Sequence, residues 1–178
     1  MDFDRGKFKA LVLYVIWRAG EQRDFGSTKL NKALWFADAR ANEALGSPIT
    51  GETYIREKFG PVPKHILDVL SELETEEQIV VWSEPFFDHK ITRFQAFQPP
   101  STDLFTREQM SLVDWWIRHV SEEHTAASIS EKSHDYAWKI AKMGEVVPMH
   151  AFLASRIRAP DGEELNWAIE EAEKLGLK

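Results

Sequence analysis

The segment from about Asp4 to Ala19 is the feature that most constrains the fold. Its apolar side chains are Phe8, Leu11, Val12, Val15, Ile16 and Trp17. At helical spacing they leave little polar face, and a helix without a polar face is buried on most sides. Gly20 follows and marks the end of the segment. The sequence therefore predicts a first helix that lies deep in a globular core.

Helical periodicity recurs through the rest of the chain. We expect helices over about 28–45, 61–73, 107–120 and 162–176, with two shorter ones near 126–131 and 135–143. Pro61 would stand at the start of the third helix, where a missing N–H costs nothing. Residues 53–58 read as a short extended stretch. Residues 146–153 fit either a strand or a helical turn.

One β-hairpin is expected in the middle of the chain. Residues 79–82 form its first strand and 90–98 its second, joined by a loop over 84–89 that is longer than a tight turn. Phe86 and Phe87 stand in this loop, where burial is difficult. Aromatic side chains are favoured anchors at protein interfaces, so they are candidates for contact with a partner. Insertion of the loop into the core is the equally weighted alternative.

The predicted elements define an α+β fold that is mostly helical. The order helix, helix, helix, hairpin resembles a winged-helix core, with one central antiparallel hairpin and a helical C-terminal half. A length of 178 residues suits one domain over 1–178, ending in an amphipathic helix over about 162–176.

Composition and charge point to the cytoplasm and to basic partners. The chain has no cysteine and a formal net charge of −7. Its longest apolar run, 10–17, is about eight residues, whereas a membrane span needs about 20. The acidic balance favours basic partners and disfavours nonspecific binding to nucleic acid. We therefore expect a cytoplasmic protein without a membrane segment.

The common catalytic and metal-binding motifs are absent from the sequence. Ser133, His134 and Asp135 are adjacent, and neighbouring side chains point apart, so a helix cap is the better interpretation. His119 and His124 are five residues apart, about 500° around a helix, and should not share a face. We predict no catalytic residue, no cofactor and no metal site.

Binding to DNA is the main alternative drawn from the residues. Basic side chains flank the third helix and the hairpin, where a winged-helix protein would contact phosphates. They are Lys58, Lys64, His65, Lys90 and Arg93. The acidic end of that helix, 72–77, disfavours contact with a groove.

Three segments together resemble the Panacea domain, the family of SocA-like antitoxins and many phage-associated proteins. Residues 29–37, KLNKALWFA, are similar to its Lys-Leu-x-Lys-Leu-Leu-Tyr-Phe-Ala helix. Residues 58–62, KFGPV, match its aromatic-Gly-Pro-Val turn, and Ser133 to Trp138 matches its Ser-His-x-x-x-x-Trp corner, although Trp138 stands four residues after His134. The chain departs from the family pattern at Asn31, where Gln is common, and at Trp35, where Tyr is favoured. The resemblance covers about 8–155, and its signature residues are Lys29, Leu30, Lys32, Phe36, Gly60, Pro61, His134 and Trp138.

The resemblance implies an antitoxin that neutralises a cognate toxin protein by direct contact, without a cofactor. In one branch of the family the antitoxin is an adaptor that delivers the toxin to a protease. We expect the signature residues to support the fold. Candidate toxin contacts are Phe86, Phe87, Glu163, Glu164, Glu170 and Glu171. A DNA-binding regulator and a hydrolase that reverses the toxin's chemistry are the alternatives.

Overall fold

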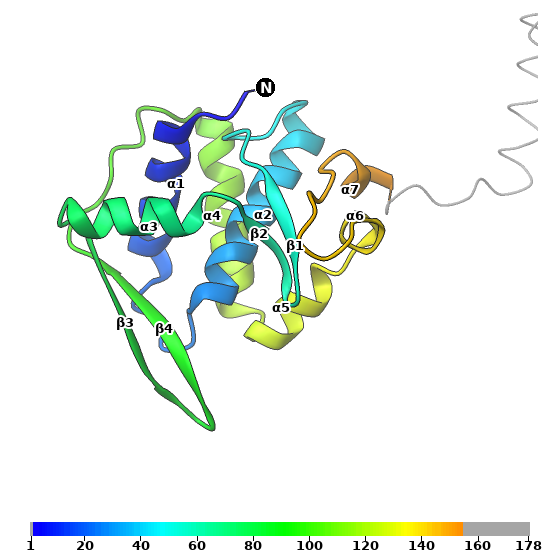
Figure 1. Cartoon of the computed structure of the whole chain (residues 1–178). Coiled ribbons are helices and arrows are strands. Elements are labelled where there is room, and N and C mark those ends of the chain that lie inside the picture. Colours follow the sequence, from blue (N-terminus) through cyan, green and yellow to red (C-terminus); the bar gives the residue numbers. More distant parts are fainter. Residues whose placement is uncertain (1, 155–178) are drawn as a thin grey trace, which may run out of the picture.

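The computed structural model describes residues 2–154 (Figure 1). Its helices are α1 (Arg5–Ala19), α2 (Ser27–Leu45), α3 (Ile66–Thr75), α4 (Arg107–Glu122), α5 (Ala126–Lys132), α6 (Tyr136–Ile140) and α7 (Ala151–Ala154). Its strands are β1 (Tyr54–Glu57), β2 (Gly60–Pro63), β3 (Ile79–Phe86) and β4 (His89–Ala96). The prediction of a mostly helical α+β fold is confirmed. The predicted helix over about 162–176 lies outside the described residues.

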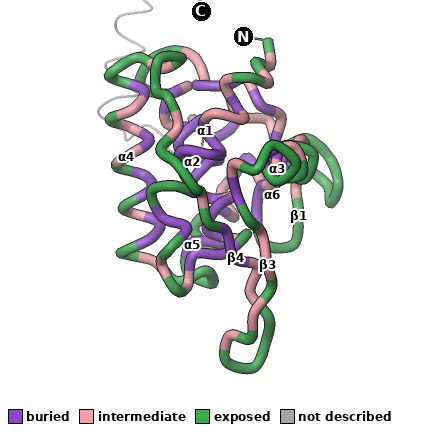
Figure 2. The backbone as a smooth tube through the Cα atoms, turned by 90° about the vertical axis from the view of Figure 1, so that its left-hand side faces the viewer, coloured by how far each residue is buried: buried purple, intermediate pink, exposed green. Residues whose placement is uncertain are grey.

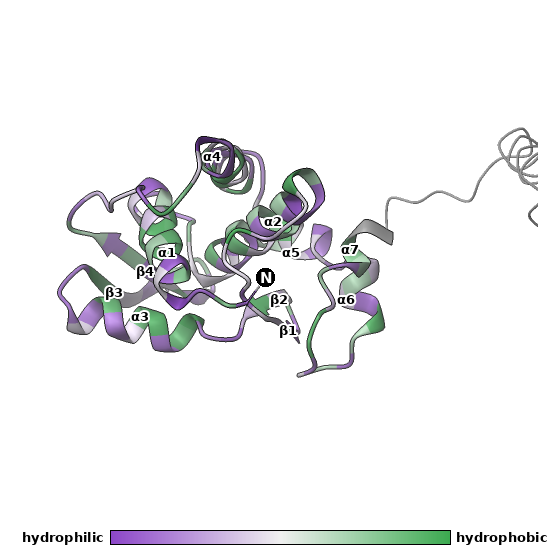
Figure 3. Cartoon of the chain, turned by 90° about the horizontal axis from the view of Figure 1, so that it is seen from above, coloured by the Kyte–Doolittle hydropathy of each residue, from purple (hydrophilic) through white to green (hydrophobic). Residues whose placement is uncertain are grey.

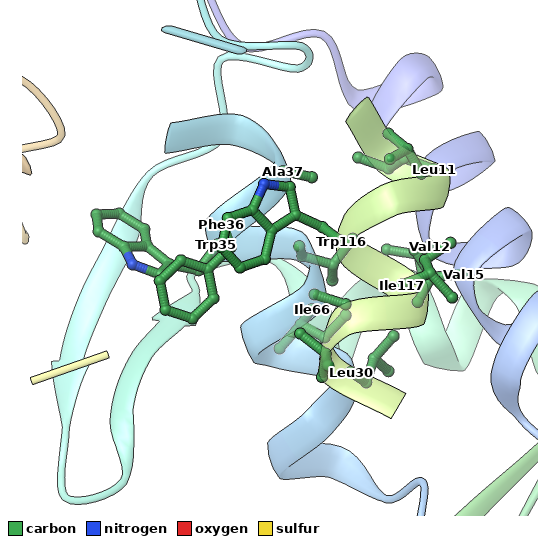
Figure 4. Close-up of a cluster of buried hydrophobic side chains, with 14 of the residues drawn as sticks. Leu11, Val12, Val15, Leu30, Trp35, Phe36, Ala37, Ile66, Trp116 and Ile117 are labelled. Carbon is green, nitrogen blue, oxygen red and sulfur yellow. The ribbon is translucent and has the colours of Figure 1, made fainter. Parts of the chain in front are cut away.

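The core lies where α1, α2 and α4 meet (Figures 2 and 4). α1 is buried along most of its length, as its apolar sequence predicts; only Trp17 of the apolar set is substantially exposed, at 41%. Phe36 of α2 stacks on Trp116 of α4, with ring centroids 4.6 Å apart. Because α2 contacts α1, α4, α5 and β2, it is the central element of the fold.

Among the described residues there are two antiparallel hairpins, β1–β2 and β3–β4, and not the single one predicted. Pro61 lies in strand β2, opposite Arg56, and α3 begins only at Ile66. The prediction that Pro61 starts a helix was therefore wrong. Proline fits because, among the described strands, β2 pairs with β1 alone, so no ladder hydrogen bond is lost on its other side.

The β3–β4 hairpin extends away from the helices and ends in a tight turn (Figures 1 and 2). Its pairing runs from Ile79 with Ala96 to Phe86 with His89, which leaves only Phe87 and Asp88 in the turn. The predicted long loop was wrong because both strands continue to the turn. Pro85 is accommodated in β3, which is an edge strand like β2.

The C-terminal part of the described chain packs as short helices beside β1 (Figure 3). α5 and α6 lie close to the predicted ranges. Val146 pairs with Ile55 as an isolated bridge, and α7 follows, so 146–154 contains both a strand-like contact and a helical turn. Across the described residues, no helix is long and apolar enough to cross a membrane.

Asp38 of α2 is a fully buried carboxylate that fixes the position of the loop between α2 and β1 by hydrogen bonds. It accepts hydrogen bonds from Ile49 N (2.8 Å), from Thr50 N (3.1 Å) and Thr50 Oγ1 (2.8 Å), and from the Tyr54 hydroxyl (2.9 Å). Burial raises the pKa of Asp38, against the effect of these donors. The role of Asp38 could not be predicted from the sequence, because its partners are 11 to 16 residues away.

Replacing Asp38 by alanine is expected to lower the free energy of unfolding by about 3 kcal/mol, because it strands several buried donors. Urea unfolding of Asp38→Ala measures the loss. Asp103→Ala, which removes an exposed carboxylate that accepts a hydrogen bond from nearby Ser101, is the matched control and should change stability by less than about 0.5 kcal/mol. Equal losses in the two variants would contradict the role given to Asp38.

Candidate functional site

The three signature segments, far apart in sequence, meet in one place. α2 carries Lys29 to Phe36, the first two residues of β2 are Gly60 and Pro61, and the corner between α5 and α6 carries His134 and Trp138. α2 packs against both β2 and α5, which brings the segments together. Leu30 and Phe36 are buried in the core, as expected of fold-supporting residues. We call the contact between α2, the β1–β2 turn and the α5–α6 corner the signature junction.

Gly60 is the tightest point of the signature junction. Its φ of +98° lies in the region that favours glycine. A Cβ atom there would stand 2.0 Å from Ser133 Oγ and 2.6 Å from Lys32 Cε. Both neighbours are themselves buried. The junction therefore needs glycine for its backbone conformation and for space.

Lys32 is a buried amine at the same point. It is 1% exposed, and its Nζ donates to the Pro61 carbonyl at 2.9 Å. Burial lowers the pKa of Lys32 from 10.5 to about 7. The hydrogen bond joins α2 to β2 across 29 residues of sequence.

Lys29 is also buried but serves a different contact. Its Nζ lies 2.7 Å from Asp24 Oδ2 and donates to the Ser121 carbonyl at 3.1 Å. Ser121 stands near the end of α4. The first signature lysine therefore joins α2 to α4, whereas Lys32 joins α2 to the β1–β2 hairpin.

The α5–α6 corner is held by ring stacking and caps. The rings of His134 and Trp138 stack with centroids 3.9 Å apart, and the Arg56 guanidinium lies 3.9 Å from the Trp138 centroid. Trp138 Nε1 donates to the Glu57 carbonyl at 3.1 Å. Burial, followed by the charges of Lys32 and Arg56, lowers the pKa of His134. The β1 strand thus packs on the corner mainly through Trp138.

Ser133, His134 and Asp135 each have a structural partner and do not converge as a catalytic triad. Ser133 Oγ donates to the Ser130 carbonyl at 2.6 Å, and Asp135 Oδ1 accepts from Trp138 N at 3.0 Å. The prediction of a helix cap is confirmed for Asp135, the N-cap of α6.

Phe87 is at the tip of the β3–β4 hairpin, away from the signature junction. Its side chain is 85% exposed and its φ is +54°. Phe86 lies edge-on to it, with ring centroids 4.8 Å apart. A bulky residue with positive φ is unfavourable for folding. The tip therefore presents an aromatic pair where glycine or asparagine would suit the backbone better.

Two of the five basic residues considered for DNA contact are engaged within the protein. Arg93 is 6% exposed, and its guanidinium donates to the carbonyls of Gly20, Glu21 and Arg23. His65 Nδ1 lies 3.0 Å from Glu52 Oε1. Lys58, Lys64 and Lys90 remain exposed. Arg93 therefore stabilises the base of the hairpin and does not face a ligand.

The structure adds Arg56 to the residues of the signature junction, which sequence reasoning missed. Besides packing on Trp138, Arg56 donates to the carbonyls of Ala141 and Lys139. The sequence of β1 alone does not predict this contact, because the partners of Arg56 lie beyond residue 135. The predicted contacts Glu163, Glu164, Glu170 and Glu171 lie outside the described residues.

The fold and the site together define the class of this protein. It is a mostly helical α+β protein whose signature segments pack around the buried Lys32 and Gly60. The family model of the SocA-like antitoxins, Panacea domain, matches residues 30–139, which is more than half of the chain. The protein belongs to this family, as its three segments indicated. A comparison with curated proteins found no match.

Proposed function

We propose that the protein is an antitoxin that neutralises a cognate toxin protein by direct, stoichiometric binding in the cytoplasm. The observation that carries the proposal is membership of the SocA-like antitoxin family over residues 30–139. Lys29, Lys32 and Trp138 contact other parts of the same chain, which supports a structural role for these residues and not a direct contact with the toxin. In this proposal those residues maintain the fold, and the toxin binds elsewhere.

For the toxin-binding surface we propose the tip of the β3–β4 hairpin. Phe87 keeps an unfavourable φ and an 85% exposed ring, a combination that folding alone does not favour. Strain of this kind is often found at functional sites. Phe86 beside it enlarges the apolar contact, and the acidic residues Glu163, Glu164, Glu170 and Glu171 are proposed to steer a basic toxin toward the protein.

A titration of toxin with antitoxin tests the function. The neighbouring gene product is the toxin to try, first by co-expression and then as purified protein. Direct blocking predicts full neutralisation at equimolar antitoxin and a complex that co-purifies. Neutralisation at far lower amounts would support a hydrolase, salt-sensitive binding to the promoter would support a DNA-binding regulator, and loss of toxin only when a protease is present would support an adaptor. Persistent growth arrest without a complex would refute the antitoxin proposal.

Replacing Phe87 by glycine is expected to weaken toxin binding while the fold is kept or stabilised. Loss of a central aromatic anchor typically costs about 2 kcal/mol of binding, roughly a 30-fold rise in Kd. Glycine accepts positive φ, so the free energy of unfolding should stay equal or rise by up to about 1 kcal/mol. Calorimetric titration gives the first value and urea unfolding the second.

Leu67→Ala is the matched control for this variant. Leu67 of α3 is also exposed, at 77%, but it lies outside the hairpin. It should leave toxin binding unchanged. An unchanged Kd for Phe87→Gly would place the binding surface elsewhere.

A further inference from the structure

Two histidines that the sequence places on different faces of a helix meet at the end of α4. α4 ends at Glu122, with Glu123 as its C-cap, so His124 leaves the helical path. The chain then turns back toward α5, and the two Nε2 atoms of His119 and His124 lie 3.3 Å apart. The prediction that these side chains diverge was wrong, because it assumed that the helix continues.

The outer nitrogen of each ring already has a neighbour. Glu123 Oε2 lies 2.7 Å from His119 Nδ1, but this contact does not have the geometry of a hydrogen bond. His124 Nδ1 lies 3.0 Å from Ser128 Oγ, and Ser128 belongs to the capping box of α5. The Ser128 hydroxyl can accept a hydrogen bond from His124 Nδ1, and the negative charge of Glu123 favours a proton on His119 Nδ1 without accepting a hydrogen bond from it. Both Nε2 lone pairs then face the space between the rings.

Two lone pairs that face each other need a cation or a donor between them. Lys132 Nζ occupies this position, 2.8 Å from His119 Nε2 and 3.5 Å from His124 Nε2. The carbonyl end of α4 also favours a positive charge here.

The separation of the two nitrogens matches the edge of a tetrahedral metal site. Zinc binds histidine nitrogen at about 2.0–2.1 Å, so two such ligands at a tetrahedral angle stand about 3.3–3.4 Å apart. The Glu123 carboxylate adds a negative charge beside His119, which favours a bound cation. His119 is further fixed by stacking on Trp115, with centroids 4.6 Å apart. The rings are therefore preorganised for a common ligand.

We propose that His119 and His124 bind a divalent transition metal ion such as Zn²⁺ through their Nε2 atoms, in exchange for the Lys132 ammonium. The remaining positions would be filled by water, since the described part of the chain has no group of three or more His, Cys, Asp or Glu around one point. Lys132 is exposed and can move into solvent to admit the ion. The site is independent of toxin binding and adds a second binding function to the protein.

Calorimetric titration of the tag-free full chain with zinc chloride tests the proposal. We expect one Zn²⁺ per chain and at least a tenfold loss of affinity in His124→Asn. His124 is the variant of choice because His119 packs between Trp115 and Trp116. His89→Asn removes an exposed histidine on the hairpin and is the matched control, with no expected change.

Lys132→Gln is expected to change zinc affinity in the opposite direction from His124→Asn. Removal of the competing ammonium should tighten zinc binding several-fold, whereas a cluster that only stabilises the surface would show no such gain. No binding by the unmodified chain up to millimolar zinc, or equal binding by His124→Asn, would overturn the site. Loss in His124→Asn with no gain in Lys132→Gln would keep the histidine pair and overturn the exchange with Lys132.

Discussion

Alanine in place of Gly60 is expected to lower the free energy of unfolding by about 4 kcal/mol. A positive φ costs a non-glycine residue about 1–3 kcal/mol, and overpacking a buried point costs a similar amount. Both apply here, since φ is +98° and the new Cβ would stand 2.0 Å from Ser133 Oγ. Ser133 cannot withdraw easily, because it is fully buried and bonded to the Ser130 carbonyl. Urea unfolding followed by circular dichroism measures the loss.

Gly46→Ala separates the two contributions. Gly46 ends α2 with φ +78°, but nothing lies within 4 Å of the Cβ that alanine would add. Only the cost of the positive φ then remains, and we expect the free energy of unfolding to fall by about 1 kcal/mol. If Gly60→Ala loses no more than Gly46→Ala, the close packing of the signature junction does not contribute to stability.

The elements that could be predicted from the sequence are those whose signal is local. The apolar character of α1 depends only on residues within one helix, and its burial is as predicted. β2 could not be recognised in this way. Gly60 and Pro61 are typical of turns, and their strand conformation depends on pairing with Glu57 and Arg56. The same holds for the hairpin turn at Phe87, where the backbone conformation opposes the residue type.

The signature residues could be located in the sequence, but their contacts could not. Lys29 and Lys32 carry charges that are usually solvated, yet both are buried. Lys29 bonds to a carbonyl 92 residues away, and Lys32 to one 29 residues away. Helical spacing contains no information on such partners. The meeting of His119 with His124 was missed for a related reason, because it depends on where α4 ends.

The buried amine of Lys32 should make folding stability rise with pH across the neutral to alkaline range. In the unfolded chain the pKa of Lys32 is near 10.5, and in the folded chain it is about 7. Between these values the unfolded chain binds a proton that the folded chain has released. Raising the pH therefore favours the folded state, by up to about 1.4 kcal/mol per pH unit. Below pH 7 the amine is charged in both states, and this dependence ends.

Comparison with Lys32→Met isolates this effect, because methionine keeps most of the side chain and has no proton to release. Between pH 7 and 9.5 the free energy of unfolding of the unmodified chain should rise by about 3 kcal/mol relative to Lys32→Met. This window excludes Tyr54, whose pKa is raised well above 10.0 by burial and by Asp38. Tyr54 would affect stability only at higher pH, and in the opposite direction.

Lys64→Met removes an exposed amine next to the same hairpin and should leave the pH dependence of the unmodified chain in place. Urea unfolding at half-unit pH steps supplies all three curves. Parallel curves for the unmodified chain and Lys32→Met would mean that Lys32 stays protonated when folded. Its bond to the Pro61 carbonyl would then be a charged one, and the signature junction would contain a buried cation at neutral pH. If the difference in unfolding free energy between the unmodified chain and Lys32→Met rises with pH, Lys32 is a neutral donor at alkaline pH. The residues around it then need not compensate a buried positive charge.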